Sequence, residues 1–236
     1  MGQLTRLHAD NLHFPPADNA LEDPPGLLAV GGDLRPERLL AAYRQGIFPW
    51  FDDSSPILWW SPDPRMVLNP ADVHCSRSLG KLIRRGLYRV TMDSAFDQVI
   101  QQCAAHRDGQ PGTWITEDMQ QAYIKLYHLG YAHSVEVWQE QTLVGGLYGI
   151  SLGRMFFGES MFSRQPNTSK LAFVALCRQL QQWSFTLIDC QLPTDHLASL
   201  GAAPMSRQRF LALLAENRVE DNQYKHWQFD DNCLVA

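Results

Sequence analysis

The sequence predicts an α+β fold arranged around an antiparallel or mixed sheet. One indication is the order of elements after residue 65, which reads as strand, two helices, several antiparallel strands, helix, strand and helix. Another is composition, because 45% of the 236 residues are hydrophobic and 19% are charged, as expected for a packed core and not for a disordered chain. The clearest is the stretch 133–191, where three strands, a helix and a short strand follow one another.

The first sixty residues differ from the rest in their sequence pattern. They contain turn sequences at 14–16 and 23–26 and only short apolar runs. Asp33 is expected to cap a helix that carries Pro36 in its first turn and ends before Gly46. The sequence Pro62-Asp-Pro64 predicts a junction. We therefore divide the chain into a small N-terminal α/β domain, residues 1–62, and a larger domain, residues 63–236.

Aromatic residues and prolines alternate in 47–51 and 58–65, which together hold three tryptophans and two phenylalanines. One interpretation is a small core stiffened by proline. The other is a platform for a flat ligand such as a nucleobase, since base–aromatic stacking contributes about 1–3 kcal/mol. We expect most of these rings to be core and one or two to line a pocket.

A basic stripe follows on the helix predicted for 76–86. Its cations recur at helical spacing and no acid interrupts the segment: Arg77, Lys81, Arg84 and Arg85. Such a run is often only a solvated helix face. In a chain of net charge −5, a stripe of one sign favours contact with the phosphate backbone of a nucleic acid.

The next elements are a strand at 88–92, a helix at 94–105 and a helix that begins after Thr116 and ends at Gly130. Strands at 133–138 and 142–150 form a hairpin. The second strand contains three glycines, which mark a bulge or a close approach of another group. A further helix is predicted at 206–216, followed by a packed tail with Trp227 and Phe229.

The candidate catalytic residues lie towards the end of the stretch 133–191. The strand at 154–163 holds one carboxylate, Glu159, among aromatics and methionines, and a helix at 169–183 follows a cap at 167–169. The last strand, 186–191, ends in Asp189 and Gln191. Residues two apart in a strand share a face, so we expect this acid and amide to point the same way and Cys190 to point into the core.

Several classes of protein are disfavoured. The five cysteines are odd in number and never form C-x-x-C, which favours reduced thiols in a cytosol. No signal peptide or membrane-length apolar run is present, and the motifs of common hydrolases, metalloproteases and phosphate-binding loops are missing. What remains is an apolar pocket with few polar groups, which suits an aliphatic side chain held beside a reacting carbonyl. Such a site needs a substrate that is already activated.

Six strings of residues carry a family resemblance that covers the chain from Phe14 onward: 46–51, 59–65, 112–116, 144–149, 157–164 and 187–191. They resemble the leucyl/phenylalanyl-tRNA–protein transferases. The resemblance implies an enzyme that moves leucine or phenylalanine, and by extension methionine, from charged tRNA to an N-terminal lysine or arginine of a protein. The product would enter the N-degron route of degradation in the bacterial cytoplasm. It also implies an acetyltransferase-like (GNAT) C-terminal domain, a mixed and mostly antiparallel sheet, and no cofactor or metal. We expect the protein to be a monomer.

The resemblance also implies roles for individual residues. Asp189 and Gln191 match the family's catalytic pair, and the basic stripe would contact tRNA phosphates. We expect Gln191 to orient the attacking amine and Asp189 to attract its positive charge. The residues implied in binding the terminal adenosine and the aminoacyl group are Trp50, Trp114, Tyr123, Leu147, Phe156, Gly158, Glu159, Met161 and Leu176.

Two alternatives stay open at this point. An acyl-CoA N-acetyltransferase could share the fold, but the stretch 161–170 lacks the glycines of that family's pyrophosphate loop. A non-catalytic RNA-binding module would account for the basic stripe and the tryptophans, but it leaves Glu159, Asp189 and Gln191 unexplained.

Overall fold

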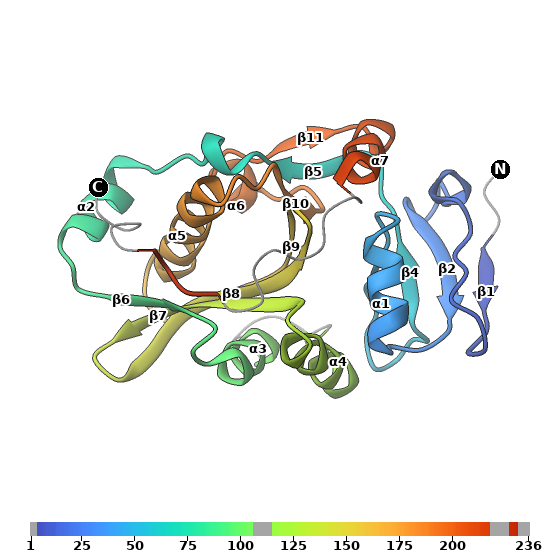
Figure 1. Cartoon of the computed structure of the whole chain (residues 1–236), viewed down its shortest axis with the longest axis horizontal. Helices are drawn as coiled ribbons and strands as arrows, with labels where there is room; N and C mark the ends of the chain where they lie inside the picture. The colour runs from blue at the N-terminus through green and yellow to red at the C-terminus, as the bar shows by residue number, and fades with distance from the viewer. Residues whose placement is uncertain (1–3, 106–114, 218–226, 231–236) are drawn as a thin grey trace.

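The computed structural model describes residues 4–105, 115–217 and 227–230. Two sheets organise these residues (Figure 1). The smaller sheet is N-terminal and has the strand order β1-β2-β4-β3, with β1 parallel to β2 and the other pairs antiparallel. Its elements are β1 (Thr5–Leu7), β2 (Leu27–Gly31), α1 (Pro36–Tyr43), β3 (Phe48–Pro49) and β4 (Leu58–Trp60).

The larger sheet has seven strands in the order β11-β5-β10-β9-β8-β7-β6. Its strands are β5 (Arg65–Leu68), β6 (Arg89–Met92), β7 (Ala132–Gln139), β8 (Thr142–Leu152), β9 (Met155–Ser163), β10 (Leu187–Gln191) and β11 (Ala203–Met205). Strands β9 and β10 run parallel and the other neighbours run antiparallel. The α+β class and the mixed, mostly antiparallel sheet are therefore confirmed.

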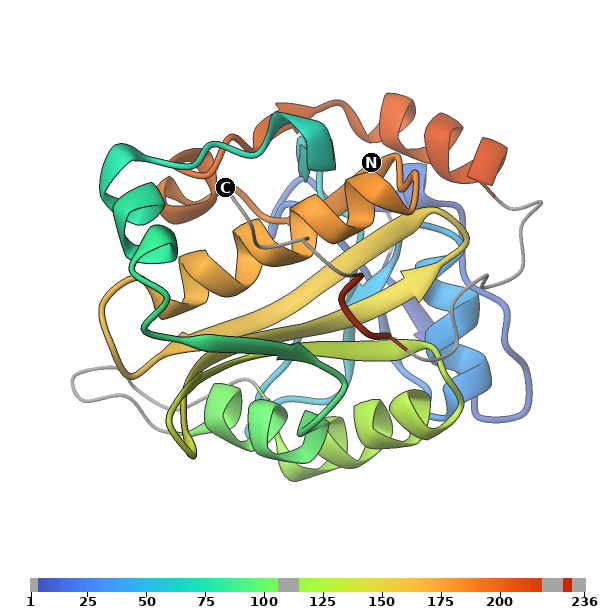
Figure 2. The same ribbon diagram turned by 60° about the vertical axis from the view of Figure 1, so that its left-hand side comes forward.

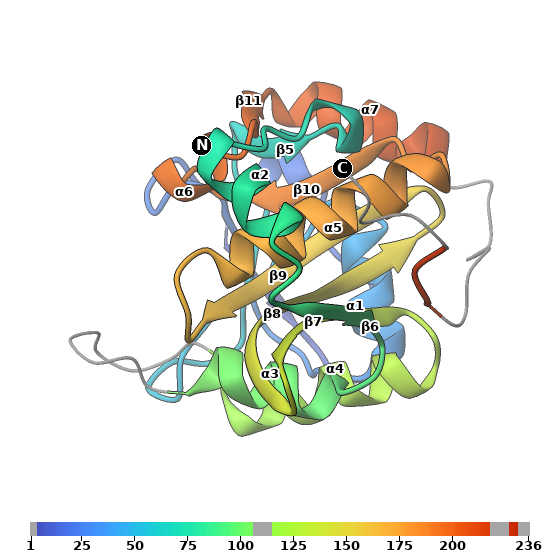
Figure 3. The same cartoon turned by 90° about the vertical axis from the view of Figure 1, so that its left-hand side faces the viewer.

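Helices cover both faces of the larger sheet. Helices α3 and α4 lie together on one face, and α5 crosses the other (Figures 2 and 3). Shorter helices α2, α6 and α7 lie around α5 and the β5 edge (Figure 3). The bounds are α2 (Arg77–Arg84), α3 (Phe96–Ala104), α4 (Glu117–His128), α5 (Thr168–Gln182), α6 (Asp195–Ala198) and α7 (Arg207–Glu216).

Two hydrophobic cores result. One lies under α5, and Trp227 joins it as predicted, stacked on His133 at 4.0 Å. The other runs from the N-terminal sheet to the side of α3 and α4, and includes Trp59, Tyr43 and Tyr123. The two sheets part between Trp60 and Arg65. The division into domains at residue 62 remains a proposal, because this second core is shared by both parts.

The glycines of β8 have the close-approach role predicted for them. A Cβ on Gly149 would lie 2.2 Å from the Phe157 carbonyl oxygen and 2.5 Å from the Phe156 ring. A Cβ on Gly145 would lie 2.4 Å from the Thr168 hydroxyl. Only hydrogen fits there, so these glycines let β9 and the start of α5 pack directly onto β8.

Helix starts were predicted with mixed success. The predicted cap Thr116 is confirmed, since its hydroxyl accepts from Met119 N–H at the start of α4. Ser76, which was not predicted as a cap, accepts from Leu79 N–H at the start of α2. The predictions for Asp33 and Asn167 were wrong. Asp33 bonds Arg35 ahead of α1, and Asn167 adopts a left-handed conformation with no side-chain cap bond.

Candidate active site

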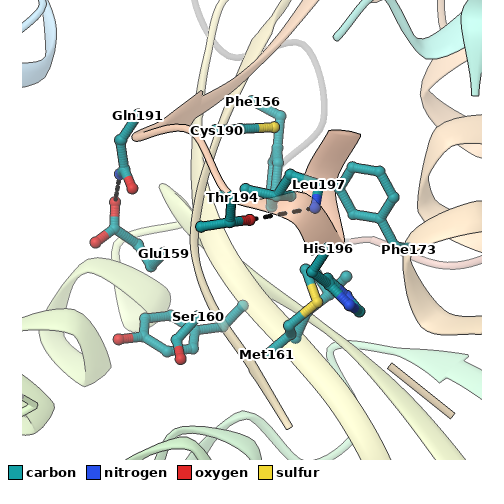
Figure 4. A pocket seen from close by; sticks show the side chains of 13 residues that line it. Phe156, Glu159, Ser160, Met161, Phe173, Cys190, Gln191, Thr194, His196 and Leu197 are labelled. Atoms are coloured by element: carbon teal, nitrogen blue, oxygen red, sulfur yellow. Dashed lines mark hydrogen bonds between the residues drawn. The ribbon is translucent and has the colours of Figure 1, made fainter. Parts of the chain in front are cut away.

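An apolar cavity of about 190 Å³ opens beside β9, α5 and α6. We call it the apolar cavity. Its apolar walls include Leu147, Phe156, Met161 and Phe173, and Glu159 and Gln191 lie together on one side (Figure 4). An engineered protein cavity of about 150 Å³ binds benzene. The apolar cavity therefore has room for a branched aliphatic or phenyl side chain.

A second cavity of about 260 Å³ adjoins the first. We call it the tryptophan cavity, because Phe48, Pro49 and Trp50 form its outer wall. It shares Glu159, Cys190, Gln191, Thr194 and Leu197 with the apolar cavity. A ligand that filled both cavities would therefore pass the Glu159–Gln191 pair.

The tryptophans divide as the sequence predicted. Trp50 is 39% exposed and lines a cavity, whereas Trp59 is fully buried in the core. Trp60 supports Trp50 from behind, with ring centroids 5.5 Å apart and its indole N–H donating to the Trp50 carbonyl oxygen. An exposed ring with a fixed orientation can stack on a nucleobase.

Glu159 lies at the meeting point of four elements. Its Oε1 accepts from the Tyr43 hydroxyl of α1 at 2.7 Å and from the Gln191 Nε2–H of β10 at 2.9 Å. Its Oε2 accepts from the Tyr123 hydroxyl of α4 at 2.9 Å. The two tyrosine oxygens are 2.5 Å apart. Among the described residues lining the two cavities, Glu159 is the only acid.

This setting changes how Glu159 titrates. Burial, and to a smaller extent the charge of Asp189, raise the pKa of Glu159 to about 7, although hydrogen bonds from Tyr43 and Tyr123 favour the carboxylate. Burial and the charge of Glu159 raise the pKa of both tyrosines, which therefore stay protonated donors. A carboxyl group with a pKa near 7 can exchange a proton at neutral pH.

Asp189 is in a different place from the one predicted. It is fully buried and lines neither cavity. Its carboxylate binds the Arg65 guanidinium in a bidentate ion pair, with Nε–Oδ1 and Nη2–Oδ2 distances of 2.8 and 2.6 Å. This position does not fit the predicted role of Asp189 in attracting the charge of an incoming amine, because Arg65 already neutralises the carboxylate and neither the apolar cavity nor the tryptophan cavity reaches it.

A bulge separates the two residues of the predicted pair. Asp189 is opposite Val67 of β5 and Gln191 is opposite Met66, so the register shifts between them. Gln191 has a φ of +61°. The prediction that 189 and 191 share a face fails for this reason, since a bulge re-aims the side chains that follow it. Cys190 is buried as expected, but it also lines both cavities.

The other predicted residues fall into three groups. Leu147, Phe156, Gly158 and Met161 line the apolar cavity. Tyr123 and Leu176 are buried and line neither cavity, and Tyr123 reaches the site only through Glu159. Trp114 lies outside the described residues.

Sequence reasoning missed several lining residues: Phe173, Thr194, His196 and Leu197. Phe173 could have been found, because it lies one helical turn before Leu176 on the same face of α5. The segment after Gln191 gave no comparable signal. Burial and Lys170 lower the pKa of His196, so a neutral imidazole borders the apolar cavity at pH 7.

The basic stripe is exposed along α2, which packs against α5 through its opposite side, where Leu79 is buried. Within the described parts of the chain, none of Arg77, Lys81, Arg84 and Arg85 makes an ion pair. In the same ranges no cluster of three or more His, Cys, Asp or Glu side chains could hold a metal ion. None of the helices described there combines the length and hydropathy that crossing a bilayer requires.

Comparison with known proteins gives consistent matches. Residues 67–215 match the family model described as leucyl/phenylalanyl-tRNA protein transferase, and residues 32–63 match the model of its N-terminal domain. Among curated proteins, a leucyl/phenylalanyl-tRNA–protein transferase of Pseudomonas fluorescens (strain Pf0-1) is 59% identical over 93% of this chain and 97% of its own. The corresponding protein of Pseudomonas entomophila (strain L48) is 61% identical over 91% and 95%.

Similar solved structures are more distant. L-PGS from Bacillus licheniformis is 10% identical with a TM-score of 0.41, covering 72% of this chain and 55% of its own. A GCN5-related N-acetyltransferase from Kribbella flavida is 11% identical with a TM-score of 0.38, covering 71% and 60%.

Proposed function

The chain belongs to the leucyl/phenylalanyl-tRNA–protein transferase family, and we propose that it moves the leucyl or phenylalanyl group of a charged tRNA to the α-amino group of an N-terminal lysine or arginine. The observation that carries this proposal is the pair of cavities that meet at Glu159 and Gln191. The apolar cavity takes the side chain of the amino acid. The tryptophan cavity takes the terminal adenosine, stacked on Trp50. The ester that joins them then lies beside Glu159 and Gln191.

The reaction is the aminolysis of an ester. The acceptor's α-ammonium, with a pKa of about 7.7–8.0, must lose a proton before it attacks the ester carbonyl. Attack forms the C–N bond, and collapse of the tetrahedral intermediate breaks the C–O bond to the ribose. The ribose oxygen then needs a proton. One group that accepts the first proton and returns it to the leaving oxygen would serve both steps.

We assign this proton transfer to Glu159 and orientation of the amine to Gln191. Gln191 Nε2–H already donates to Glu159, which leaves the Gln191 amide oxygen to accept from the amine. A neutral amide is a poor base, whereas the pKa of Glu159, about 7, is close to that of the amine. Orientation of the reactants can itself lower the barrier by several kcal/mol.

The exposed cations of α2 provide the tRNA contact in this proposal. Arg77, Lys81, Arg84 and Arg85 are free of ion pairs within the described chain and would contact the phosphate backbone. The protein would act as a monomer in the bacterial cytoplasm. Its product would be a substrate of N-degron degradation. Methionine would serve as a further donor, because an unbranched thioether adapts to an apolar cavity shaped for leucine.

A transfer assay tests the function. The protein is mixed with labelled leucyl-tRNA and a peptide that begins with arginine, with and without ribonuclease. We expect label on the peptide, no label after ribonuclease treatment, and no label when the arginine is N-acetylated or replaced by alanine. Binding of tRNA without transfer, or acetyl transfer from acetyl-CoA, would contradict the proposal.

A further inference from the structure

Arg65 is a fully buried arginine outside the predicted set of site residues. Each of its three guanidinium nitrogens donates a hydrogen bond. Besides the bidentate pair with Asp189, its Nη1 donates to the Gly46 carbonyl oxygen at 3.1 Å. Its guanidinium lies between the rings of Phe48 and Phe210, 4.8 and 4.7 Å from their centroids. A planar cation with this many fixed partners is held rigidly.

The bound Asp189 acts on the backbone of Gln191. Oδ1 of Asp189 accepts from the Gln191 backbone N–H at 2.9 Å, while the same oxygen accepts from Arg65 Nε–H. The side-chain amide of Gln191 instead donates to Glu159. Asp189 therefore stabilises the backbone conformation of Gln191 and does not hydrogen-bond its side-chain amide.

That backbone conformation is strained. Gln191 has a φ of +61°, and the Leu192 N–H donates to the Cys190 carbonyl oxygen at 2.8 Å across it. This is a γ-turn with positive φ at its centre, the rare form. Such a conformation persists only where surrounding contacts enforce it, and the hydrogen bond from Gln191 to Asp189 is one of those contacts.

The guanidinium of Arg65 also contacts the segment that leads to the tryptophan cavity. Gly46, whose carbonyl oxygen Arg65 binds, begins the segment 46–50, and Phe48 of that segment packs on the guanidinium. The segment ends at Trp50, the exposed ring of the tryptophan cavity. One guanidinium therefore connects the strand that carries Gln191 with the segment that carries Trp50.

We propose that Arg65 is a positioning residue for the transfer reaction. Through Asp189 it holds Gln191 in the conformation that places its amide beside Glu159, and through Gly46 and Phe48 it holds Trp50 at the correct distance from that pair. The proposal rests on the proposed function. Lysine keeps the charge but cannot form the bidentate pair, so Arg65→Lys isolates the geometric part of the role.

A double-mutant cycle tests this inference in single-turnover leucine transfer. We expect Arg65→Lys and Asp189→Asn each to lower the rate on the order of 10- to 100-fold, since a displacement of about 1 Å can cost that much. Affinity for leucyl-tRNA should fall by a smaller factor than the rate, because the α2 contacts are untouched and only the stacking on Trp50 is affected. The double variant should be no slower than the slower single variant, because both changes break the same unit.

Two further variants keep the test decisive. Arg38→Lys is the matched control, because Arg38 is also fully buried and binds backbone carbonyl oxygens, those of His8 and Asn11, away from both cavities. It should lower thermal stability without lowering the transfer rate. If Arg65→Lys does not fold, Phe210→Leu removes one ring from the guanidinium and should give a smaller loss of rate, again with unchanged tRNA affinity.

The inference is overturned if Arg65→Lys, or Phe210→Leu in its place, transfers leucine at the wild-type rate. It is also overturned if the losses of Arg65→Lys and Asp189→Asn multiply in the double variant, since independent roles would behave that way. Failure of the proposed function looks different. In that case the wild-type protein itself transfers no leucine.

Discussion

At the scale of single residues, the account depends on the protonation of one carboxyl group. Glu159 receives hydrogen bonds from Tyr43, Tyr123 and Gln191, and burial raises its pKa to about 7. A carboxylate with an ordinary pKa of about 4.3 would be a much weaker match for an amine of pKa 7.7–8.0. The burial of this carboxyl group therefore has a chemical consequence as well as a structural one, although the hydrogen bonds from the two tyrosines oppose the rise in its pKa.

The pH dependence of transfer follows from this pKa. With saturating substrates, we expect the single-turnover rate to rise with pH through about 7 and then level off, because the Glu159 carboxylate is the active form. Glu159→Gln should lower the plateau on the order of 10²-fold or more, the usual contribution of a general base. Its remaining rate should rise through about 7.7–8.0, the pKa range of the free amine. An unchanged profile in Glu159→Gln would reject the assignment.

Gln191 is tested by truncation. Gln191→Ala should reduce the transfer rate on the order of 10- to 100-fold through loss of orientation, with little change in the affinity for leucyl-tRNA. Gln181→Ala, at an exposed glutamine of α5, is the matched control and should behave as wild type. Equal losses of rate and of tRNA affinity in Gln191→Ala would indicate a binding role instead.

Residue types alone predicted part of this site. A single carboxylate among aromatics pointed to Glu159, and the polar end of an apolar strand pointed to Gln191. The same reasoning misplaced Asp189, because strand periodicity assumes a regular strand and the bulge at 190 breaks it. Arg65 could not be assigned as its partner, since the two residues lie 124 positions apart in the chain.

At the scale of elements, helices and long strands were predicted within a few residues, because their hydrophobic periodicity is strong and their starts carry capping residues such as Ser76 and Thr116. The short elements β11 and α6 were not predicted. They span only 3 and 4 residues, too few for periodicity to develop. The segment containing α6 contributes Thr194, His196 and Leu197 to the cavity, so missing it also left the site incomplete.

The basic stripe of α2 predicts how the affinity for leucyl-tRNA depends on salt concentration. In Arg84→Glu/Arg85→Glu, leucyl-tRNA should bind more weakly, and the slope of log affinity against log salt should become shallower by roughly 0.7–0.9 for each phosphate that the variant no longer neutralises. The matched control is Lys125→Glu/Arg209→Glu, which changes the net charge equally at exposed residues of α4 and α7. If both double variants show the wild-type slope, α2 does not contact the tRNA backbone.

At the scale of the whole molecule, the site exists because two sheets meet. Tyr43 and Trp50 come from the N-terminal part, and Glu159 and Gln191 come from the larger sheet. The sequence predicted the two parts but not their contact, because the residues that join them are far apart in the chain. The core that both parts share gives the contact its rigidity.

Burial of Glu159 also affects global stability. Because its pKa is raised in the folded state, the folded protein binds this proton more tightly than the unfolded chain does. The contribution of Glu159 to the free energy of unfolding is therefore present below about pH 4.3 and is lost as pH rises through about 7, by no more than about 4 kcal/mol. Denaturant unfolding of wild type and Glu159→Gln between pH 5 and 8 measures it. We expect the difference to move in favour of Glu159→Gln as pH rises, and a constant difference would contradict the raised pKa.

The central claim is that the aminoacyl ester spans the two cavities at the Glu159–Gln191 pair. A crystal structure with a non-hydrolysable leucyl-adenosine analogue tests it most directly. We predict the isobutyl group among Leu147, Phe156, Met161 and Phe173, the adenine against Trp50, and the carbonyl carbon beside Gln191. A leucyl group bound outside the apolar cavity, or a carbonyl beyond hydrogen-bonding reach of both Glu159 and Gln191, would contradict the account.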